Sequence, residues 1–221
     1  MAPARPAARS AARSTARLGS GGSAQETRVA LLDAALAIVA EQGVQALTHR
    51  GVEARAQVSH GVTTYHFRTR AAMIAALLEH ICDRQIAWVT RMYDELGALA
   101  DNLPTAPADR EAFTARIVQL LLAERPLTLA RYELYLHAAR DPQTQRLVAD
   151  LRARHVAVQA QMFAAAGAPD PEFAANRLLS LTDGMLLYQL SAPEADFEQW
   201  APGFLVEITD LVAPMCRPAG G

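Results

Sequence analysis

The residues best suited to chemistry lie together in one stretch, VSHGVTTYHF, at positions 58–67. Hydroxyl, imidazole and phenol groups of this kind can form an active site, a metal site, or a surface that makes hydrogen bonds with another molecule. The polar members and the one glycine are Ser59, His60, Gly61, Thr63, Thr64, Tyr65 and His66. Their spacing, and the elements that hold them, decide between these three settings.

The spacing argues against a metal site and against catalysis. His60 and His66 are six residues apart and fall on different faces of a helix, a poor geometry for two ligands of one ion. His80, Cys82 and Asp83 are no better, because helical residues two apart do not face one another. No Gly-x-Ser-x-Gly elbow, phosphate loop or dinucleotide fingerprint is present. We therefore expect no metal ligands, no cofactor and no catalytic residues.

Charge is distributed unevenly along the 221 residues, although the formal net charge is only -2. Positions 1–70 hold nine arginines against four acidic residues, and the remainder holds twelve against nineteen. This asymmetry indicates an N-terminal partner such as nucleic acid and a body that has none. A pI near 6.3 disfavours indiscriminate coating of DNA.

Two further features bear on localisation. No apolar run approaches the roughly 18 to 20 residues needed to cross a bilayer. Cys82 and Cys216 are far apart and match no metal or redox spacing, which favours a reducing compartment without a disulfide framework. We therefore expect a soluble, cytoplasmic protein with no membrane partner.

Residues 1–24 differ in composition from the rest of the chain. They are rich in Ala, Arg, Ser, Pro and Gly, contain no acidic residue, and carry an arginine at every fourth position from Arg5 to Arg17. Such a segment cannot bury enough apolar surface to fold. It is predicted to be a disordered basic tail, and three roles stay open: a solvated tail, an arm that neutralises phosphates, or an organelle transit peptide.

The remaining chain has the pattern of helices throughout. Good N-caps stand at Ser23, Thr48, Ser59 and Thr69, and Gly43 ends the first helix. They predict helices over about 25–42, 48–56 and 59–67, and a long helix from residue 70. Later starts are marked by Pro107, Pro126, Pro142, Pro171 and Pro193. No segment shows the period-two alternation of strands, so the predicted fold class is all-α.

Two short helices joined by a tight turn, the second with small polar side chains, are typical of a helix-turn-helix. Its second helix places N-terminal residues against base edges in the major groove, and nearby cationic and hydroxyl groups hold phosphates. A three-helix DNA-binding domain is therefore predicted over 25–70, followed by a helical domain over 71–217. The glycine at position 61 would let the backbone approach the duplex.

Residues 27–80 resemble the TetR family of transcriptional regulators. The likeness rests on LLDAALAIVAEQGV followed by ALTHRGVEARAQVSHGVTTYHFRTRAAMIAALL. The matching motifs are Leu47-Thr48 at the entry to the second helix, Val58-Ser59 at the third, Tyr65-His66-Phe67 at its exit, and the basic Arg70 at the start of helix four.

The resemblance implies a role for individual residues. Arg50 falls where relatives often contact a base, and the other DNA-facing positions are His49, Thr63, Thr64, Tyr65, His66 and Arg70. We expect Arg50, Thr63 and Tyr65 to read or position on bases. We expect Thr48, His66 and Arg70 to hold phosphates.

Two positions depart from the family pattern. Glu53 stands where a small alanine is usual, and Gln57 stands where a turn glycine is usual. A non-glycine residue in a left-handed turn costs about 1 kcal/mol, and a carboxylate at position 53 must find a partner or solvent. A different conformation of the turn is therefore an alternative.

Beyond residue 80 the resemblance is one of architecture, and it implies a domain that binds a small ligand and dimerises through its last two helices. The helix near 173–190 has two apolar faces and so needs burial on both, either in a dimer or within one monomer. The ligand-pocket candidates are Trp88, Met92, Phe113, Tyr132, Tyr135, His137, Met162, Asp183 and Tyr188. Asp183 is the strongest of these candidates, because a carboxylate on a buried helix needs a hydrogen-bonding partner or a ligand.

These observations together predict a homodimeric, ligand-responsive regulator that binds a palindromic DNA operator and is released by a small-molecule effector. A repressor is the expected form. The alternatives are a transcriptional activator of the same fold, an all-α enzyme acting on a small molecule, and an architectural DNA-binding protein.

Overall fold

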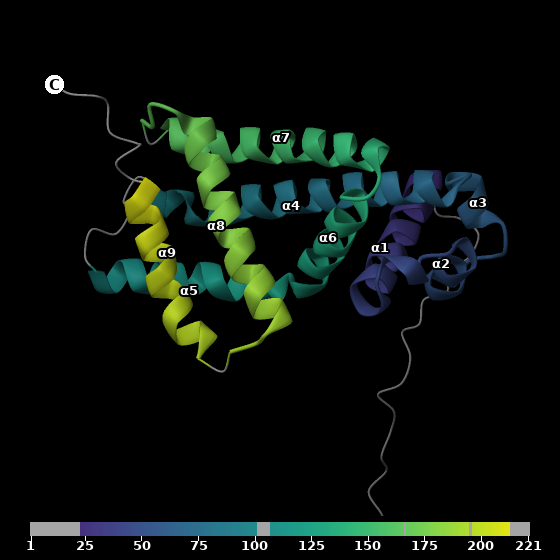
Figure 1. Ribbon diagram of the computed structural model, residues 1–221, viewed down its shortest axis with the longest axis horizontal. Helices are drawn as coiled ribbons and strands as arrows, with labels where there is room; N and C mark the ends of the chain where they lie inside the picture. The colour runs from purple at the N-terminus through teal and green to yellow at the C-terminus, as the bar shows by residue number, and fades with distance from the viewer. Residues whose placement is uncertain (1–22, 101–106, 166, 195, 213–221) are drawn as a thin grey trace, which may run out of the picture.

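The computed structural model describes residues 23–100, 107–165, 167–194 and 196–212, and every regular element in these ranges is a helix, which confirms the all-α prediction (Figure 1). The predicted basic tail lies outside the described residues, apart from its last two. The elements are α1 (Ala24–Gln42), the short η1 (Val44–Ala46), α2 (His49–Ala56), α3 (Val62–His66), α4 (Arg70–Ala100), α5 (Pro107–Ala123), α6 (Arg125–Ala138), α7 (Pro142–Ala165), α8 (Pro171–Ser191) and α9 (Phe197–Val212).

Three of the predicted N-caps are confirmed. The Ser23 hydroxyl accepts from the Glu26 amide while the Glu26 carboxylate accepts from the Ser23 amide, so the capping box is complete. The Thr48 hydroxyl accepts from the Gly51 amide at 3.1 Å, and the Thr69 hydroxyl accepts from the Ala72 amide at 3.0 Å. Local sequence therefore fixes where α1, α2 and α4 begin.

Two predicted helix starts are wrong. α3 begins at Val62 with Gly61 as its N-cap, not at Ser59, because a carboxylate from α2 accepts from the Gly61 amide, which Ser59 was expected to cap, and from the Thr63 amide. The last helix begins at Phe197, not at Pro193, because Glu194 belongs to the preceding turn. Its amide donates to the Gln189 side chain at 3.0 Å and its carboxylate accepts from an indole N–H at 3.0 Å.

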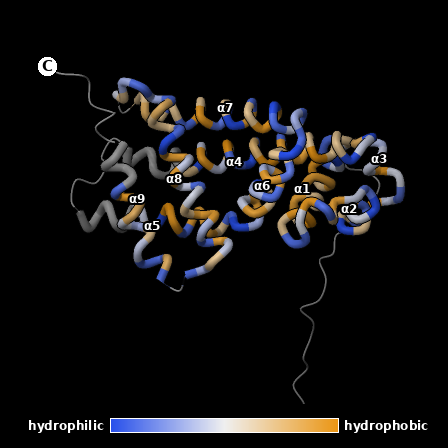
Figure 2. The backbone as a smooth tube through the Cα atoms, viewed as in Figure 1, coloured by the Kyte–Doolittle hydropathy of each residue, from blue (hydrophilic) through white to orange (hydrophobic). Residues whose placement is uncertain are grey.

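The described helices bury two apolar clusters. The first gathers side chains of α1, α2, α4 and α6, and Figure 2 shows the apolar positions where α1, α4 and α6 meet. The second lies among α5, α7, α8 and α9. α6 contributes Leu127, Ala130 and Leu134 to the first cluster, so this helix of the C-terminal half is packed into the core of the N-terminal half.

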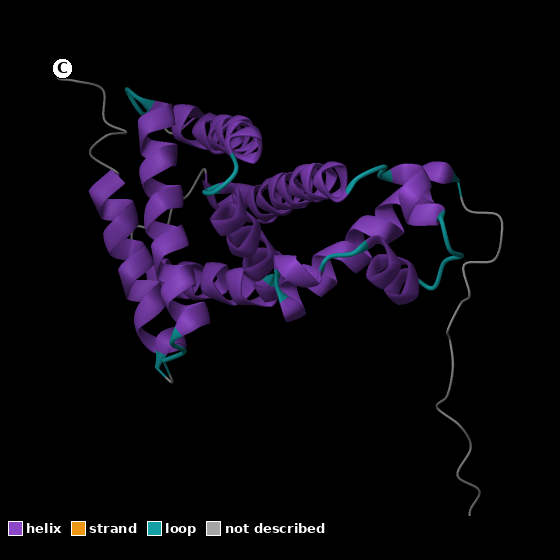
Figure 3. Cartoon of the chain, turned by 45° about the vertical axis from the view of Figure 1, so that its right-hand side comes forward, coloured by secondary structure: helices purple, strands orange, loops and turns teal. Residues whose placement is uncertain are grey.

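The packing places the N-terminal helices at one end of an elongated molecule. α1, α2 and α3 gather at that end, and α5, α8 and α9 lie toward the other, with α4 running between them (Figures 1 and 3). α8 packs on α7, α9 on α5 and α6 on α1. No helix within the described ranges is long and apolar enough to span a membrane.

Candidate nucleic-acid interface and effector site

The turn between α2 and α3 has the left-handed conformation that a glycine would normally supply. Gln57 has φ 56° and ψ 37°, and its amide donates to the Ala54 carbonyl at 3.4 Å. The alternative of another turn conformation is therefore wrong. A side chain in this region of backbone space costs about 1 to 2 kcal/mol, so other contacts must hold the turn.

Glu53 supplies those contacts. One carboxylate oxygen accepts from the Gly61 amide at 2.9 Å and from the Thr63 amide at 3.2 Å, and the other accepts from His60 Nδ1 at 3.1 Å. The acid is buried, and burial raises its pKa, but the hydrogen bonds from His60 and from the two amides outweigh burial and hold the pKa below its ordinary value. Glu53, which departs from the family pattern, thus acts as a clamp: its carboxylate holds the backbone amides at the start of α3.

The outer face of α2 and α3 is polar and exposed. Tyr65 is a large aromatic side chain that is 80% exposed. The other exposed candidates are Thr48, Arg50, Ser59, His60 and Thr64. Exposed phenol, hydroxyl, imidazole and guanidinium groups of this kind can form hydrogen bonds with phosphates and base edges.

Two of the predicted DNA-facing residues are turned inward. Thr63 has no exposed area and its hydroxyl has no partner in the structure, so the prediction that it touches bases is wrong. Its side chain faces the core because the clamp on its amide fixes the rotation of α3. His49 is half-buried and its Nε2 bonds to the Phe67 carbonyl at 2.7 Å, which ties the start of α2 to the end of α3.

The two remaining basic candidates are half-buried. Burial and the positive charge of Arg28 hold the pKa of His66 below its ordinary value, which favours the neutral imidazole. Arg70 Nε donates to the Leu47 carbonyl at 3.0 Å and its terminal nitrogen donates to the Val44 carbonyl at 2.5 Å. Arg70 therefore joins the start of α4 to the segment that precedes α2.

The ligand-pocket candidates do not form one site. Tyr132, Tyr135 and Asp183 lie in one network, whereas Tyr188 is 62% exposed on α8 and the side chain of Phe113 lies outside the described residues. Met92 is buried, and Trp88, His137 and Met162 are half-buried. A crevice of about 10 Å³ among α5, α6 and α8 and an open groove of about 440 Å³ at the junction of α7 and α8 are lined by other residues.

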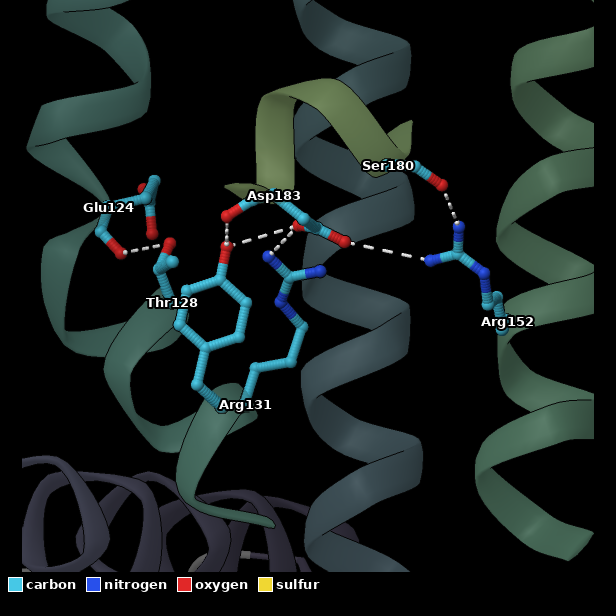
Figure 4. Close-up of polar contacts among 7 residues, drawn as sticks. Glu124, Thr128, Arg131, Arg152, Ser180 and Asp183 are labelled. Carbon is cyan, nitrogen blue, oxygen red and sulfur yellow. Dashed lines mark hydrogen bonds and ion pairs between the residues drawn. The ribbon is translucent and has the colours of Figure 1, made fainter. Parts of the chain in front are cut away.

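The network centres on Asp183 of α8 (Figure 4). Arg131 of α6 is only 4% exposed and donates to the carboxylate at 2.6 Å. Arg152 of α7 lies 3.6 Å from the other carboxylate oxygen and donates to Ser180 at 3.1 Å. The Tyr132 hydroxyl donates to the Asp183 carbonyl at 2.9 Å and is 3.1 Å from its carboxylate, so three helices meet at one acid.

Sequence reasoning missed both arginines and the nearby His155. Burial, together with the charge of Arg131, lowers the pKa of His155 to about 4, so the imidazole is neutral at pH 7. Arg131 and Asp183 are 52 residues apart, and no local pattern pairs them. The one available signal was Asp183 itself, which sits on a helix with two apolar faces.

A short helix with an exposed polar face, held by a tight turn against a second helix, defines a helix-turn-helix nucleic-acid-binding protein. The pattern of the bacterial regulatory proteins of the tetR family matches residues 31–77, and that of the tetracyclin repressor-like C-terminal domain matches residues 108–214. A TetR-family member from Streptomyces coelicolor A3 is 30% identical over 83% of this chain and 98% of its own, with a TM-score of 0.60. The chain belongs to the TetR family.

Two other similar proteins add to this comparison. The multidrug binding protein EbrR, solved with ethidium, is 28% identical over 82% of this chain and 98% of its own, with a TM-score of 0.56. The HTH-type transcriptional repressor Rv3405c of Mycobacterium tuberculosis is 37% identical over 57 residues, which span 26% of this chain and 30% of the repressor. The likeness to EbrR thus runs through both halves of the fold, and the likeness to Rv3405c covers one segment.

Proposed function

We propose that this protein is a homodimeric transcriptional repressor that binds a palindromic DNA operator through α2 and α3 and is released from it by a small-molecule effector. The observation that carries the proposal is the exposed face of α3, where the Tyr65 side chain is exposed to solvent next to exposed Thr64. Family membership and the likeness to a repressor support it. Such a protein acts in the cytoplasm, where bacterial DNA lies, and performs no catalysis.

DNA contacts are assigned by exposure. Arg50 and Tyr65 would contact base edges, while Thr48 and Thr64 would hold phosphates; all four side chains are exposed. His60 is exposed as well, and its ring would donate a hydrogen bond to a phosphate. On this proposal the DNA-binding domain ends near residue 70, where α4 begins.

A dimer through α8 and α9 is supported by what the monomer leaves uncovered. Phe173, Leu187 and Tyr188 on α8 and Trp200 on α9 are large apolar side chains that remain exposed. Twofold pairing of these helices would cover them. Tyr188→Asp should give a monomer in light scattering, whereas Leu136→Asp, at an equally exposed apolar site on α6, should leave the dimer intact. A dimeric Tyr188 variant would remove this interface from the proposal.

Release by an effector requires contact between the two halves, and α6 provides it. One face of α6 is packed on α1, and its Glu133 carboxylate lies 3.5 Å from the Val44 amide. The Val44 carbonyl accepts a hydrogen bond from Arg70 of α4. A ligand that shifts α6 or α4 would therefore move the segment leading into α2. The likeness to a protein solved with a small molecule supports such a ligand here.

The test is operator binding, measured by fluorescence anisotropy on DNA flanking the protein's own gene, with shuffled DNA of equal length as the control. Arg50→Ala should weaken operator binding by about 1 to 3 kcal/mol and relax its sequence preference. Equal affinity of the unmodified protein for both DNAs would reject a specific regulator and favour an architectural protein. Reporter expression that falls on deletion of the gene would favour an activator.

A further inference from the structure

The network around Asp183 has more positive than negative charge. Arg131 and Arg152 both face the single carboxylate, at 2.6 Å and 3.6 Å, and each is a permanent cation. The charged groups that act on the adjacent His155 are the same three. Tyr132 and Tyr135 are neutral, because burial raises the pKa of both phenols. Where α6, α7 and α8 meet, the cluster therefore carries one uncompensated positive charge.

The cluster also contains polar atoms that lack a partner. Arg131 Nε and His155 Nε2 are both buried and neither has a hydrogen-bonding partner in the structure. Leaving such an atom unpaired costs about 1 to 3 kcal/mol. A guanidinium nitrogen can only donate, and a neutral imidazole protonated at Nε2 donates there too, so each of these atoms can bond to an acceptor. The surplus positive charge and the unpaired guanidinium donor both favour an anion at this cluster.

We infer that the effector of this regulator is a small organic carboxylate whose carboxylate group binds Arg131 and Arg152 in place of Asp183. This inference rests on the proposed function. The Asp183 side chain then acts as an internal substitute for the ligand, in the arrangement that Figure 4 shows. A cationic ligand is disfavoured, because it would add to the surplus charge.

The position of the cluster gives binding a route to DNA. The neighbouring crevice among α5, α6 and α8, lined by Thr128 and Leu186 among others, has a volume of only about 10 Å³, the space of about one water molecule. A carboxylate with an organic body must therefore separate α6 from α8. Because α6 is packed on α1, this separation favours a state in which the DNA-binding end is displaced.

Three isosteric probes that differ in charge test the inference: benzoate, neutral benzamide and cationic benzamidine. Calorimetry on the full-length protein at constant ionic strength should give the tightest binding with benzoate and the weakest with benzamidine. Inorganic phosphate, a fourth probe, should bind at least about tenfold more weakly than benzoate, because it has no organic body. Benzoate should also lower operator affinity in the anisotropy assay.

Variants assign the binding to the cluster. Arg152→Gln should weaken benzoate about tenfold or more, and Asp183→Asn, which removes the internal competitor, should strengthen it about tenfold. Arg146→Gln removes the same charge from an exposed site on α7 and should change neither value. Urea unfolding of each variant comes first, and Arg152→Gln decides the question if Asp183→Asn does not fold.

Four results would overturn the inference: tighter binding of benzamidine than of benzoate, tighter binding of phosphate than of benzoate, an unchanged benzoate affinity in Arg152→Gln, or no binding of benzoate at about 10 mM. The inference and the proposed function can fail separately. Tight operator binding without any anion effect would refute the carboxylate alone, and loss of operator specificity in the ligand-free protein would refute the regulator.

Discussion

Arg70 tests whether an arginine at the DNA-binding end contacts DNA or holds the protein together. The family likeness assigns it to a phosphate, but its guanidinium already donates to the Leu47 and Val44 carbonyls at 3.0 Å and 2.5 Å. A hydrogen bond from a charged group contributes about 1.5 to 3 kcal/mol. Because the side chain is half-buried, each of the two bonds is expected to contribute about 1.5 kcal/mol, the lower end of this range. Arg70→Ala should therefore lower the free energy of unfolding by about 3 kcal/mol.

The salt dependence of operator binding separates the two roles. A phosphate contact adds about 0.9 to the slope of log affinity against log salt, because it releases counterions. If Arg70 only positions the segment before α2, Arg70→Ala should weaken operator binding while its salt slope stays unchanged. Anisotropy titrations between about 50 and 200 mM salt measure the slope, and urea unfolding measures stability.

The neighbouring Arg68 is the matched control, because it is exposed and carries the same charge. Arg68→Ala should leave stability within about 0.5 kcal/mol of the unmodified protein. If Arg70→Ala instead flattened the salt slope by about one per protomer and left urea unfolding unchanged, the positioning role would be refuted.

Three further predictions concern buried or strained groups. Glu53→Ala should destabilise the protein and weaken operator binding more than Glu53→Gln, since the glutamine side-chain oxygen still accepts from the Gly61 amide. Because the pKa of Glu53 is lowered in the folded state, its contribution to stability is present at neutral pH and lost as pH falls below about 4.5, which urea unfolding at a series of pH values measures. Gly61→Ala should cost about 1 to 2 kcal/mol of stability by thermal unfolding, because φ at this position is +90°. A Cβ there meets no atom, so the cost comes from the backbone conformation alone, and Gly61→Asn should cost less. Half-buried His155 binds its proton only below about pH 4 when folded but near 6.5 when unfolded, so stability should fall on the order of 3 kcal/mol as pH drops between these values, and His155→Gln should flatten that fall.

Each of these has an outcome that contradicts it. Equal losses in Glu53→Ala and Glu53→Gln would mean that the charge and not the amide bonds holds α3. Equal losses in the two Gly61 variants would mean that the backbone conformation is not the cause. A pH profile that is unchanged in His155→Gln would place the titration elsewhere.

Local chemistry made much of the fold predictable from the sequence. The helix starts at Ser23, Thr48 and Thr69 depend on side-chain oxygens within three residues of the amides they cap, so short sequence patterns identify them. The N-cap predicted at Ser59 is not formed, because the relevant contact is not local. Glu53 accepts from the Gly61 amide that Ser59 was expected to cap and from the Thr63 amide, and no local rule for caps anticipates a carboxylate from another helix.

The candidate sites depend on longer-range geometry, and the sequence predicted them only in part. Exposed Arg50 and Tyr65 follow from the helix-turn-helix pattern, but the inward rotation of Thr63 follows from a bond that reaches across ten residues. In the C-terminal half the sequence singled out Asp183 as a carboxylate in need of a partner. Its partner Arg131 is 52 residues away and could not be identified by spacing.

α6 has two roles in this architecture. One face buries Leu127, Ala130 and Leu134 in the core of the DNA-binding end, while Arg131 on another face is held by α8. A buried ion pair contributes little net stability compared with apolar packing, because both charges lose their hydration. The polar network is therefore a weak point in an otherwise apolar contact, and a competing anion could open it without unfolding either core. A ligand that replaces Asp183 changes the partner of α6, and the helix carries that change to α1.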